Sequence, residues 1–534
     1  MTRELSFWGW GYSDKFPNED GLRNLAGFAG AMLGSPDITP RTPPKLSDLE
    51  LRDVRVTAPD TLAALCSSTV ADRASHTYGK GYKDLIRGFH RDFSPAPDLV
   101  ARPRNEEDIA ALLDWCSTNE IALIPFGGGT SVVGGVEGDV GDRFKGVVSL
   151  DLRGLDRVLE VDPVSRAARI QAGATGPVLE AQLAEHGFSL RHFPQSFEFS
   201  TLGGWIATRA GGHFATVYTH IEDLVESTRM LTPRGPFESR RLPGSGAGPS
   251  PDRLVAGSEG TLGVITEAWM RLHAKPRWRS SASVKFMDFG AAVTATREIA
   301  QSKLFPSNCR LLDSHEARLH QVTGDGANVL VLGFESADHP VEHWMTRALA
   351  IATSHGGDCP KGPVHKDGDK VSSRGAAGTW RNAFIEMPYM FNALVSLGVV
   401  VDTFETACTW DRFDELHNAV IENVRAAMKR ECGGGLISCR FTHVYPDGPA
   451  PYYTFIAPGK SGGEIEQWMA IKHAANDALI KHGATITHHH AVGRLHRPWY
   501  ERQRPELFGD VIAATKKTLD PAGVLNPGVL IQSS

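Results

Sequence analysis

The chain has 534 residues, of which 41% are hydrophobic and 22% are charged, so it can bury a large core and is long enough for roughly two to four domains. Its formal net charge of −6 argues against the basic surface of a nucleic-acid-binding protein, and we expect no nucleic-acid partner. No apolar run reaches the ~18 residues of a membrane-spanning helix, which argues against an integral membrane protein.

The seven cysteines are scattered along the chain without a Cys-x-x-Cys pair. An odd and scattered set is typical of reduced thiols rather than of a disulfide framework. The first 34 residues lack the basic start and the continuous apolar run of a signal peptide. We therefore expect a cytoplasmic protein, and peripheral contact with a membrane stays open.

The predicted elements begin with an N-terminal extension, residues 1–92, which has a helix-like run at Gly21–Leu33 and is expected to pack on the body. In residues 93–275, short strands alternate with amphipathic helices, the first of which is capped by Asn105. No Gly-x-Gly-x-x-Gly motif opens a helix after the first strand, which argues against a Rossmann crossover. The order of elements favours an α+β nucleotide-binding domain.

Residues 276–500 are predicted to form a second α+β domain. Its predicted strands include Ala282–Phe286, Val329–Phe334, Ser438–Val444 and Tyr452–Ile456, and its predicted helices include Val341–Thr353, Phe413–Met428 and Glu464–Lys481. The stretch Gly356–Gly378, rich in Gly, Lys and Ser, is predicted to be a mobile loop. Residues 501–534 carry many turn signals and are expected to return to the first domain.

Three glycine-rich loops lie within the first domain: Pro125–Ser131, Ser200–Gly204 and Gly257–Thr266. Glycines let backbone N–H groups approach and donate to a pyrophosphate, and nearby hydroxyls add further donors. One such loop alone is more often a tight turn. Three loops in one domain instead indicate a large phosphate-bearing cofactor, and the pattern points to a flavin.

The first and third loops, together with the closing Asn526-Pro-Gly528, resemble the vanillyl-alcohol oxidase type of FAD flavoprotein. This resemblance implies an α+β fold, with a two-lobed FAD-binding domain and an α+β substrate (cap) domain. No His or Cys lies within Gly127–Gly135, so noncovalent FAD is predicted. The residues expected to contact the cofactor are Pro125, Gly127, Gly128, Gly129, Thr130, Ser131, Pro194, Ser200, Thr201, Gly203, Gly204, Thr208, Arg209, Glu259, Gly260, Gly263, Val264 and Ile265.

Longer runs resemble the alkyldihydroxyacetonephosphate synthase family more narrowly. The matching runs are Phe197–Ala210, Ile221–Val225, Leu231–Gly235, Phe404–Thr406, Trp410–Arg412 and His488–His490, together with Phe7–Tyr12. The resemblance implies a transferase of ether lipid synthesis that exchanges the acyl chain of acyl-dihydroxyacetone phosphate for a fatty alcohol. In that family the substrate carbon is held as a covalent adduct on flavin N5, with no net redox change.

The resemblance also implies roles for single residues. Tyr452 matches the tyrosine that removes the substrate proton, whereas the residues alone favour an ordinary alternating core strand. A phenol has a free pKa of about 10, so this role requires nearby cations or donors, for which Arg310 and the histidines are candidates. The triplet His488, His489 and His490 lines the catalytic centre in that family and is expected to handle protons and orient the substrate.

A metal site is the alternative interpretation of the His triplet, because side chains at i and i+2 of a strand share a face and imidazole binds zinc. No carboxylate or cysteine is spaced near the triplet in the sequence. We therefore predict that the protein binds no metal there.

The chain departs from the family at Phe391, where an arginine is expected to hold the substrate phosphate. An aromatic ring cannot donate to a phosphate, and an unpaired dianion in a closed pocket would cost several kcal/mol. Either Arg381, Lys370 or Arg374 replaces that arginine, or the substrate lacks the phosphate.

Two other functions stay open at this stage. One is an FAD-dependent oxidase or dehydrogenase of a 2-hydroxy acid or an alcohol, which Phe391 and the closing Asn526-Pro-Gly528 favour. The other is a flavin-binding scaffold without activity. As partners we expect a small-molecule lipid substrate and a second copy of the chain, in a homodimer.

Overall fold

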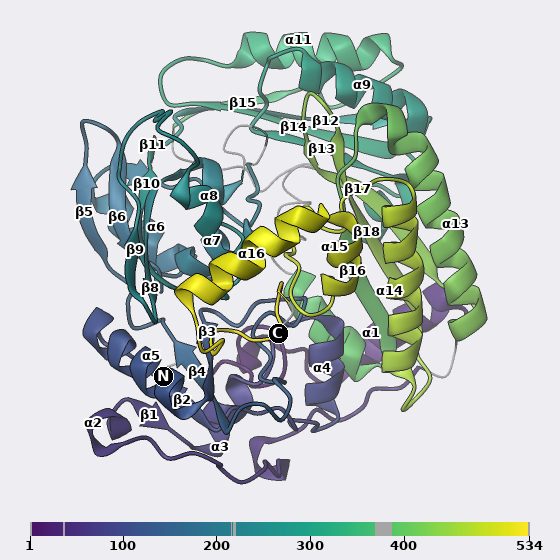
Figure 1. Ribbon diagram of the computed structural model, residues 1–534. Coiled ribbons are helices and arrows are strands. Elements are labelled where there is room, and N and C mark those ends of the chain that lie inside the picture. The colour runs from purple at the N-terminus through teal and green to yellow at the C-terminus, as the bar shows by residue number, and fades with distance from the viewer. Residues whose placement is uncertain (1–2, 36–37, 215, 217–219, 369–386, 532–534) are drawn as a thin grey trace.

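The computed structural model describes residues 3–35, 38–214, 216, 220–368 and 387–531. In these residues, two α+β parts lie side by side, one built from strands of the first half of the chain and one from strands of the second half (Figure 1). Helix α16 (Glu506–Leu519), drawn in yellow, crosses between them.

The first part contains a four-stranded and a five-stranded sheet among the described residues. The four-stranded sheet has the order β1-β2-β4-β3, with β2, β4 and β3 parallel, and its strands are β1 (Cys66–Ser67), β2 (Leu99–Ala101), β3 (Ile121–Phe126) and β4 (Gly146–Asp151). The five-stranded sheet is antiparallel, in the order β5-β6-β10-β8-β9: β5 (Val158–Asp162), β6 (Ala167–Gln171), β8 (Val225–Thr232), β9 (Gly235–Glu238) and β10 (Val264–Arg271). A small pair, β7 (Phe188–Ser189) and β11 (His273–Ala274), lies beside it.

Among the helices in the first half of the chain, the first and the fourth pack against the second part of the molecule, and the others lie around these sheets. In chain order, the helices of this half are α1 (Glu19–Leu33), α2 (Asp60–Ala63), α3 (Val70–Ser75), α4 (Tyr82–Phe89), α5 (Glu106–Asn119), α6 (Gly176–Glu185), α7 (Leu202–Thr208) and α8 (Pro251–Val255). Asn105 caps α5 by accepting from the Asp108 N–H at 2.9 Å, as predicted.

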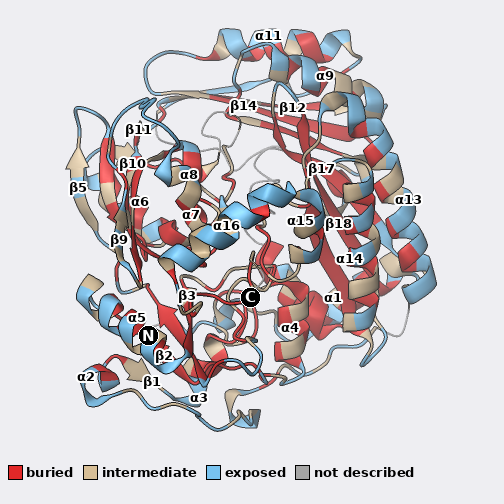
Figure 2. Ribbon diagram, viewed as in Figure 1, coloured by how far each residue is buried: buried red, intermediate tan, exposed pale blue. Residues whose placement is uncertain are grey.

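The second part is one large antiparallel sheet with the order β15-β12-β14-β13-β17-β18-β16. Its strands are β12 (Trp278–Phe286), β13 (Asn308–Leu312), β14 (Asn328–Ser336), β15 (Val364–Asp367), β16 (Val399–Glu405), β17 (Leu436–Val444) and β18 (Pro449–Pro458). The helices are α9 (Phe289–Gln301), α10 (Ser314–Leu319), α11 (Glu342–Ser354), α13 (Phe413–Cys432), α14 (Glu464–Lys481) and α15 (Arg497–Gln503), and residues 387–396 are also helical. Strands β17 and β18 are buried almost throughout, whereas α13 keeps an exposed outer face (Figure 2).

Alternation along the central strands gives the sheet two different faces. On β18, Tyr453 and Phe455 pack in the hydrophobic core with the helices α13 and α14. Their neighbour Tyr452 points the other way and lines a cavity. On β17, Cys439 packs in the same core, while Arg440 lines the cavity. The helix-covered face therefore stabilises the fold, and the opposite face is free to carry polar chemistry.

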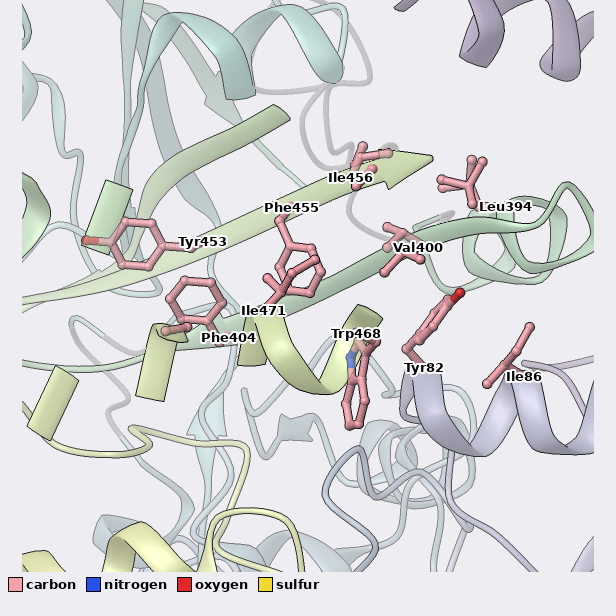
Figure 3. Close-up of a cluster of buried hydrophobic side chains, with 14 of the residues drawn as sticks. Tyr82, Ile86, Leu394, Val400, Phe404, Tyr453, Phe455, Ile456, Trp468 and Ile471 are labelled. Atoms are coloured by element: carbon pink, nitrogen blue, oxygen red, sulfur yellow. The ribbon is translucent and has the colours of Figure 1, made fainter. Parts of the chain in front are cut away.

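The core on the helix-covered face also holds the N-terminal residues in place. Tyr82 of α4 and Trp468 of α14 have ring centroids 6.3 Å apart and lie in one cluster with Val400 and Phe404 (Figure 3). The Trp468 indole donates to the Asp402 carboxylate at 2.7 Å, which satisfies its buried N–H.

The C-terminal segment returns to the first part of the molecule. Leu525 forms a parallel bridge with Leu123 of β3. The side-chain amide of Asn526 donates to the backbone oxygens of Gly135 at 2.9 Å and Glu259 at 2.7 Å. Two glycine-rich loops are therefore fastened to the tail.

The strands and helices predicted from the sequence are confirmed, with shifted ends. The predicted loop Gly356–Gly378 is wrong in part, because Val364–Asp367 forms strand β15 and pairs with Trp278–Ser281 of β12. This edge strand is mostly exposed, so it lacks the apolar alternation that would reveal it in the sequence. Residues 369–378 lie outside the described residues.

Trp468→Ala should lower the free energy of unfolding by roughly 3–5 kcal/mol, because the side chain is only 1% exposed and its removal leaves a cavity. Urea unfolding monitored by circular dichroism measures the change. Trp344→Ala in α11 is the matched control, since this tryptophan is 36% exposed and should cost about 0.5 kcal/mol. Equal losses in the two variants would contradict the packing role of Trp468.

Candidate active site

The first glycine loop leaves β3 at Phe126 and lies directly against the second loop. A Cβ atom on Gly127 would lie 2.3 Å from the Thr201 hydroxyl oxygen, and one on Gly128 would lie 2.0 Å from the Phe199 carbonyl oxygen. Both distances are far below van der Waals contact, so the two loops can approach this closely only with glycine at these positions.

The two loops, with parts of the third, line one end of a cavity of about 1790 Å³, measured to include its open mouth. The predicted cofactor contacts that line this cavity are Pro125, Gly127, Gly128, Gly129, Thr130, Ser131, Pro194, Ser200, Thr201, Gly203, Gly204, Thr208, Glu259, Gly260, Gly263 and Ile265.

Two predicted cofactor contacts lie elsewhere. Val264 is fully buried in a hydrophobic core. Arg209 forms an ion pair with Glu222, a partner that it shares with Arg253. Neither side chain is among the cavity-lining residues.

The loops have the donors that a pyrophosphate requires. Among the described residues, the N–H groups of residues 127–130 donate no hydrogen bond to another part of the chain. Buried backbone donors are almost always satisfied, so a row of free N–H groups at a cavity wall fits an anionic ligand. The Gly135 N–H donates to the Ser131 hydroxyl at 2.9 Å, which holds the end of the loop. The residues present therefore fit an FAD pyrophosphate.

The opposite wall of the cavity is a row of polar side chains across three strands. Tyr452 of β18 pairs in register with Glu405 of β16 and with Arg440 of β17. The Arg440 guanidinium carbon lies 3.8 Å from the centroid of the Tyr452 ring. The Tyr452 hydroxyl donates to the Thr403 hydroxyl at 2.9 Å. Burial raises the pKa of Tyr452, and the positive charge of Arg440 opposes that rise.

Glu405 holds the His triplet beside this row. Its carboxylate accepts the backbone N–H groups of His488 at 2.6 Å, His489 at 3.2 Å and His490 at 2.9 Å. The Thr487 hydroxyl donates to it at 2.6 Å. Burial would raise the pKa of Glu405, but the adjacent histidines and the Thr487 hydroxyl keep it well below its usual range.

The loop held in this way brings two histidine rings to Tyr452. The ring centroids of Tyr452 and His489 are 6.0 Å apart, and those of Tyr452 and His490 are 5.4 Å apart. Burial lowers the pKa of His489 to about 3 and that of His490 to about 4, so both rings are neutral at pH 7 and each has one nitrogen that can accept a hydrogen bond. His489 and His490 line the cavity, whereas His488 lies behind them.

Arg310 lines the cavity as expected, but the cation stacked on the phenol is Arg440. Burial, together with the charge of Arg440, lowers the pKa of Arg310 to about 9. No pattern in the sequence marks Arg440, although its place on the same face as Tyr452 follows once the strands are paired. Lys80 and His443 also line the cavity and were not expected from the sequence.

Phe391 lies in the cavity wall, with Trp10 and Met387 among the other apolar residues of the lining. The Trp10 N–H donates to the side-chain oxygen of Asn392 at 2.7 Å, which joins the N-terminal segment to the helical residues 387–396. The three suggested replacements for an arginine at this position, Arg381, Lys370 and Arg374, lie outside the described residues.

Contrary to the expectation from the sequence, a carboxylate does lie near the His triplet, because strand pairing brings Glu405 to it. Potential ligand atoms of Glu405, His488 and His489 lie within 4.8 Å of one another. Both Glu405 oxygens, however, already accept hydrogen bonds from the Thr487–His490 segment. The arrangement is that of an anchored loop, and the absence of metal stays a prediction.

Comparisons with known proteins agree with this geometry. Residues 97–238 match the family described as FAD binding domain, and residues 275–530 match FAD linked oxidases, C-terminal domain. The alkyldihydroxyacetonephosphate synthase of Dictyostelium discoideum is 34% identical over 475 residues, which cover 86% of this chain and 77% of that protein. No helix in the described part of the chain has the length and apolarity to cross a membrane.

Solved structures show the same fold. An alkyldihydroxyacetonephosphate synthase structure has a TM-score of 0.81 at 28% identity and covers 98% of both chains. The 4-ethylphenol oxidase of Gulosibacter chungangensis has a TM-score of 0.67 at 14% identity, covering 88% of this chain and 94% of its own, and shows likeness of fold alone. The expected α+β fold of the vanillyl-alcohol oxidase type and the FAD cofactor are thus confirmed, and the chain belongs to the alkyldihydroxyacetonephosphate synthase family of FAD-dependent enzymes.

Proposed function

We propose that the protein is an FAD-dependent transferase that exchanges the acyl chain of acyl-dihydroxyacetone phosphate for a fatty alcohol, in the synthesis of ether lipids. Family membership supports this reaction. The observation that carries it is one cavity with a glycine-loop end and a wall that joins Tyr452, Arg440 and His489.

In this proposal the free N–H groups of residues 127–130 and the hydroxyls of Thr130 and Ser131 hold the pyrophosphate of FAD. We expect FAD to be held without a covalent bond, because Gly127–Gly135 contains no His or Cys that could attach to the flavin. When bound, FAD would supply an electron-accepting ring for the reaction. The flavin is therefore expected to dissociate when the protein is denatured.

Tyr452 removes a proton from the substrate carbon. Burial alone would disfavour the phenolate, but Arg440 stacks on the ring and the Thr403 hydroxyl contacts the phenol oxygen at 2.9 Å. Both groups stabilise negative charge at the oxygen. His489 and His490 lie next to the ring, where a neutral imidazole can accept a hydrogen bond from the hydroxyl of the incoming alcohol and orient it.

The phosphate of the substrate requires positive charge that Phe391 cannot supply. Lys80, Arg310 and Arg440 all line the cavity. Burial lowers the pKa of Lys80 to about 8, a cost that a bound phosphate would offset. We propose that Lys80 and Arg310 bind this phosphate in place of the missing arginine.

An oxidase or dehydrogenase of a 2-hydroxy acid or an alcohol is the second candidate, and Phe391 is the observation that favours it. A 2-hydroxy acid needs no phosphate site. Anaerobic titration of the flavin absorbance separates the two functions, since a hydroxy acid would leave the flavin reduced. The transferase should bleach with acyl-dihydroxyacetone phosphate and recover its colour when fatty alcohol is added without oxygen.

A homodimer and a peripheral membrane contact stay predictions. Helix α16 exposes the apolar side chains of Leu507, Phe508 and Val511. Analytical ultracentrifugation and vesicle sedimentation of the intact protein test the two contacts separately. The cytoplasmic location also stays a prediction.

Tyr452→Phe should lower the transferase rate by about 10²–10⁴-fold, the usual contribution of a general base, and abolish bleaching by the acyl substrate. The matched control is Tyr453→Phe, because this neighbouring hydroxyl contacts His417 at 3.3 Å on the helix-covered face. Stopped-flow absorbance of the flavin measures both variants. Unchanged bleaching in Tyr452→Phe would remove the catalytic role.

Phe391→Arg should lower the KM for the phosphate-bearing substrate about tenfold, since a charge-assisted hydrogen bond contributes roughly 1.5–3 kcal/mol. Phe391→Met keeps an apolar side chain and serves as the control. Initial rates at varied substrate concentration give the KM of each variant. If arginine and methionine give the same KM, the phosphate does not bind at this wall.

Gly128→Ala should weaken FAD binding by about tenfold or more, because its Cβ would lie 2.0 Å from the Phe199 carbonyl oxygen and force the two loops apart. The ratio of flavin to protein absorbance after gel filtration measures the loss. Gly27→Ala is the control, since nothing lies within 4 Å of its added Cβ in helix α1. Full retention of flavin in Gly128→Ala would contradict the proposal that these two glycine-rich loops bind FAD.

A further inference from the structure

A buried carboxylate on α10 lies behind the cavity wall and binds Arg440. Glu316 is 0% exposed and does not line the cavity. Its Oε1 atom accepts a hydrogen bond from the Arg440 guanidinium, and its Oε2 atom accepts one from the Ser438 hydroxyl. Nε2 of His320, one helical turn further on, lies 3.2 Å from Oε1. Burial alone would raise the pKa of Glu316, but Arg440, His320 and Ser438 lower it to about 2, so the side chain is an anion at pH 7.

The helix that carries Glu316 is fixed to the strand that carries Arg440. Asp313 caps α10 by accepting from the N–H of Glu316 at 2.7 Å, and its other carboxylate oxygen accepts from the N–H of Cys439 at 2.7 Å. The Asp313 N–H donates to the Cys439 carbonyl oxygen at 2.9 Å. Cys439 directly precedes Arg440 in β17, so the backbone of Glu316 is held at a set distance from the guanidinium.

Arg440 matters because charges of both signs act on the Tyr452 phenol. The ionisable side chains that act on this phenol or face its ring are Arg440, Asp402, Glu405, His489 and His490. Burial and the two carboxylates raise the pKa of Tyr452, and both imidazoles are neutral. Within this set the charge of Arg440 is the one that lowers the pKa. A phenolate at Tyr452 therefore depends on the guanidinium remaining against the ring, where its carbon lies 3.8 Å from the ring centroid.

We propose that Glu316 is a positioning residue for the proton-removal step, because it holds the Arg440 guanidinium against the Tyr452 ring. As a charge alone, Glu316 would disfavour a phenolate, since both are anions. Through Arg440 its effect has the opposite sign, so the carboxylate acts by fixing a position.

In this step the phenolate oxygen of Tyr452 takes the proton from the substrate carbon. The electron pair of the C–H bond stays with that carbon, and Tyr452 becomes a neutral phenol. The inference rests on the proposed function, which assigns the removal of this proton to Tyr452.

Glu316→Asp tests the positioning role, because it keeps the negative charge on a side chain that is one methylene shorter. Since Asp313 fixes α10 to β17, the shorter carboxylate cannot reach Arg440 and Ser438 together. Bleaching of the flavin by acyl-dihydroxyacetone phosphate should be about tenfold slower at pH 7, with unchanged flavin content and KM. Displacement of the cation raises the pKa of Tyr452, so the increase of the bleaching rate with pH should move to higher pH.

Glu464→Asp is the matched control. Glu464 is 2% exposed, pairs with Arg41 at 2.8 Å and does not line the cavity. This variant should keep the wild-type bleaching rate and pH profile. A Glu316→Asp enzyme whose pH profile matches the wild type, or moves to lower pH, would overturn the positioning role.

Glu316→Gln separates position from charge, because it keeps the length of the side chain and an oxygen that accepts from Arg440. It should therefore bleach faster than Glu316→Asp. A glutamine variant slower than the aspartate variant would show that Arg440 needs the charge rather than the reach of residue 316, and would also overturn the proposal.

Crystal structures of the holoprotein test the same placement without turnover. The Arg440 guanidinium should lie over the Tyr452 ring in the wild type and in Glu316→Gln, and should leave the ring in Glu316→Asp. A guanidinium that remains over the ring in Glu316→Asp contradicts the positioning role. A wild-type enzyme that exchanges no acyl chain would contradict the proposed function, while these structures would still report on Arg440, so the two failures can be told apart.

Discussion

One buried carboxylate organises the polar wall of the cavity in this protein. Glu405 ends the strand β16, pairs in register with Tyr452, and accepts three backbone N–H groups and a hydroxyl from the Thr487–His490 segment. A charge buried this deeply is stable only when its hydrogen bonds are complete. The loop that completes these hydrogen bonds also carries the three histidines. Burial of the Glu405 carboxylate therefore fixes the position of the histidine rings.

Side chains alternate along the strands of the large sheet, so that one face packs against helices and stabilises the fold while the other face lines the cavity. Tyr453 and Phe455 of β18 pack under the helices, and Tyr452, which precedes them, faces the cavity. Arg440 of β17 faces the same way, where it pairs with the buried carboxylate of Glu316 and stacks on Tyr452. The Glu316 carboxylate therefore holds the Arg440 guanidinium in place, and the guanidinium lies against the Tyr452 ring. A buried arginine in this position lowers the cost of a phenolate that burial would otherwise forbid.

Much of the fold and part of the site could be predicted from the sequence. The glycine loops are visible because close backbone approach requires a run of glycines, and the helices and buried strands have regular apolar spacing. Tyr452 stood out only through resemblance to a family, because an alternating strand of this composition is ordinary core. Arg440 and Glu405 were missed, since no spacing in the sequence reveals which residues of three separate strands will lie in one row. The exposed edge strand Val364–Asp367 was missed because it lacks an apolar face.

The sequence by itself determined most of the elements, the three glycine-rich loops and the presence of a tyrosine and a histidine triplet that resemble those of a known family. These features depend on local chemistry, such as a missing Cβ atom or the alternation of side chains along a strand. Only the tertiary structure decided which charge lies against the phenol and which carboxylate anchors the histidines. Each of these joins residues far apart in the chain, and their distances depend on strand register and helix packing, which local sequence does not encode.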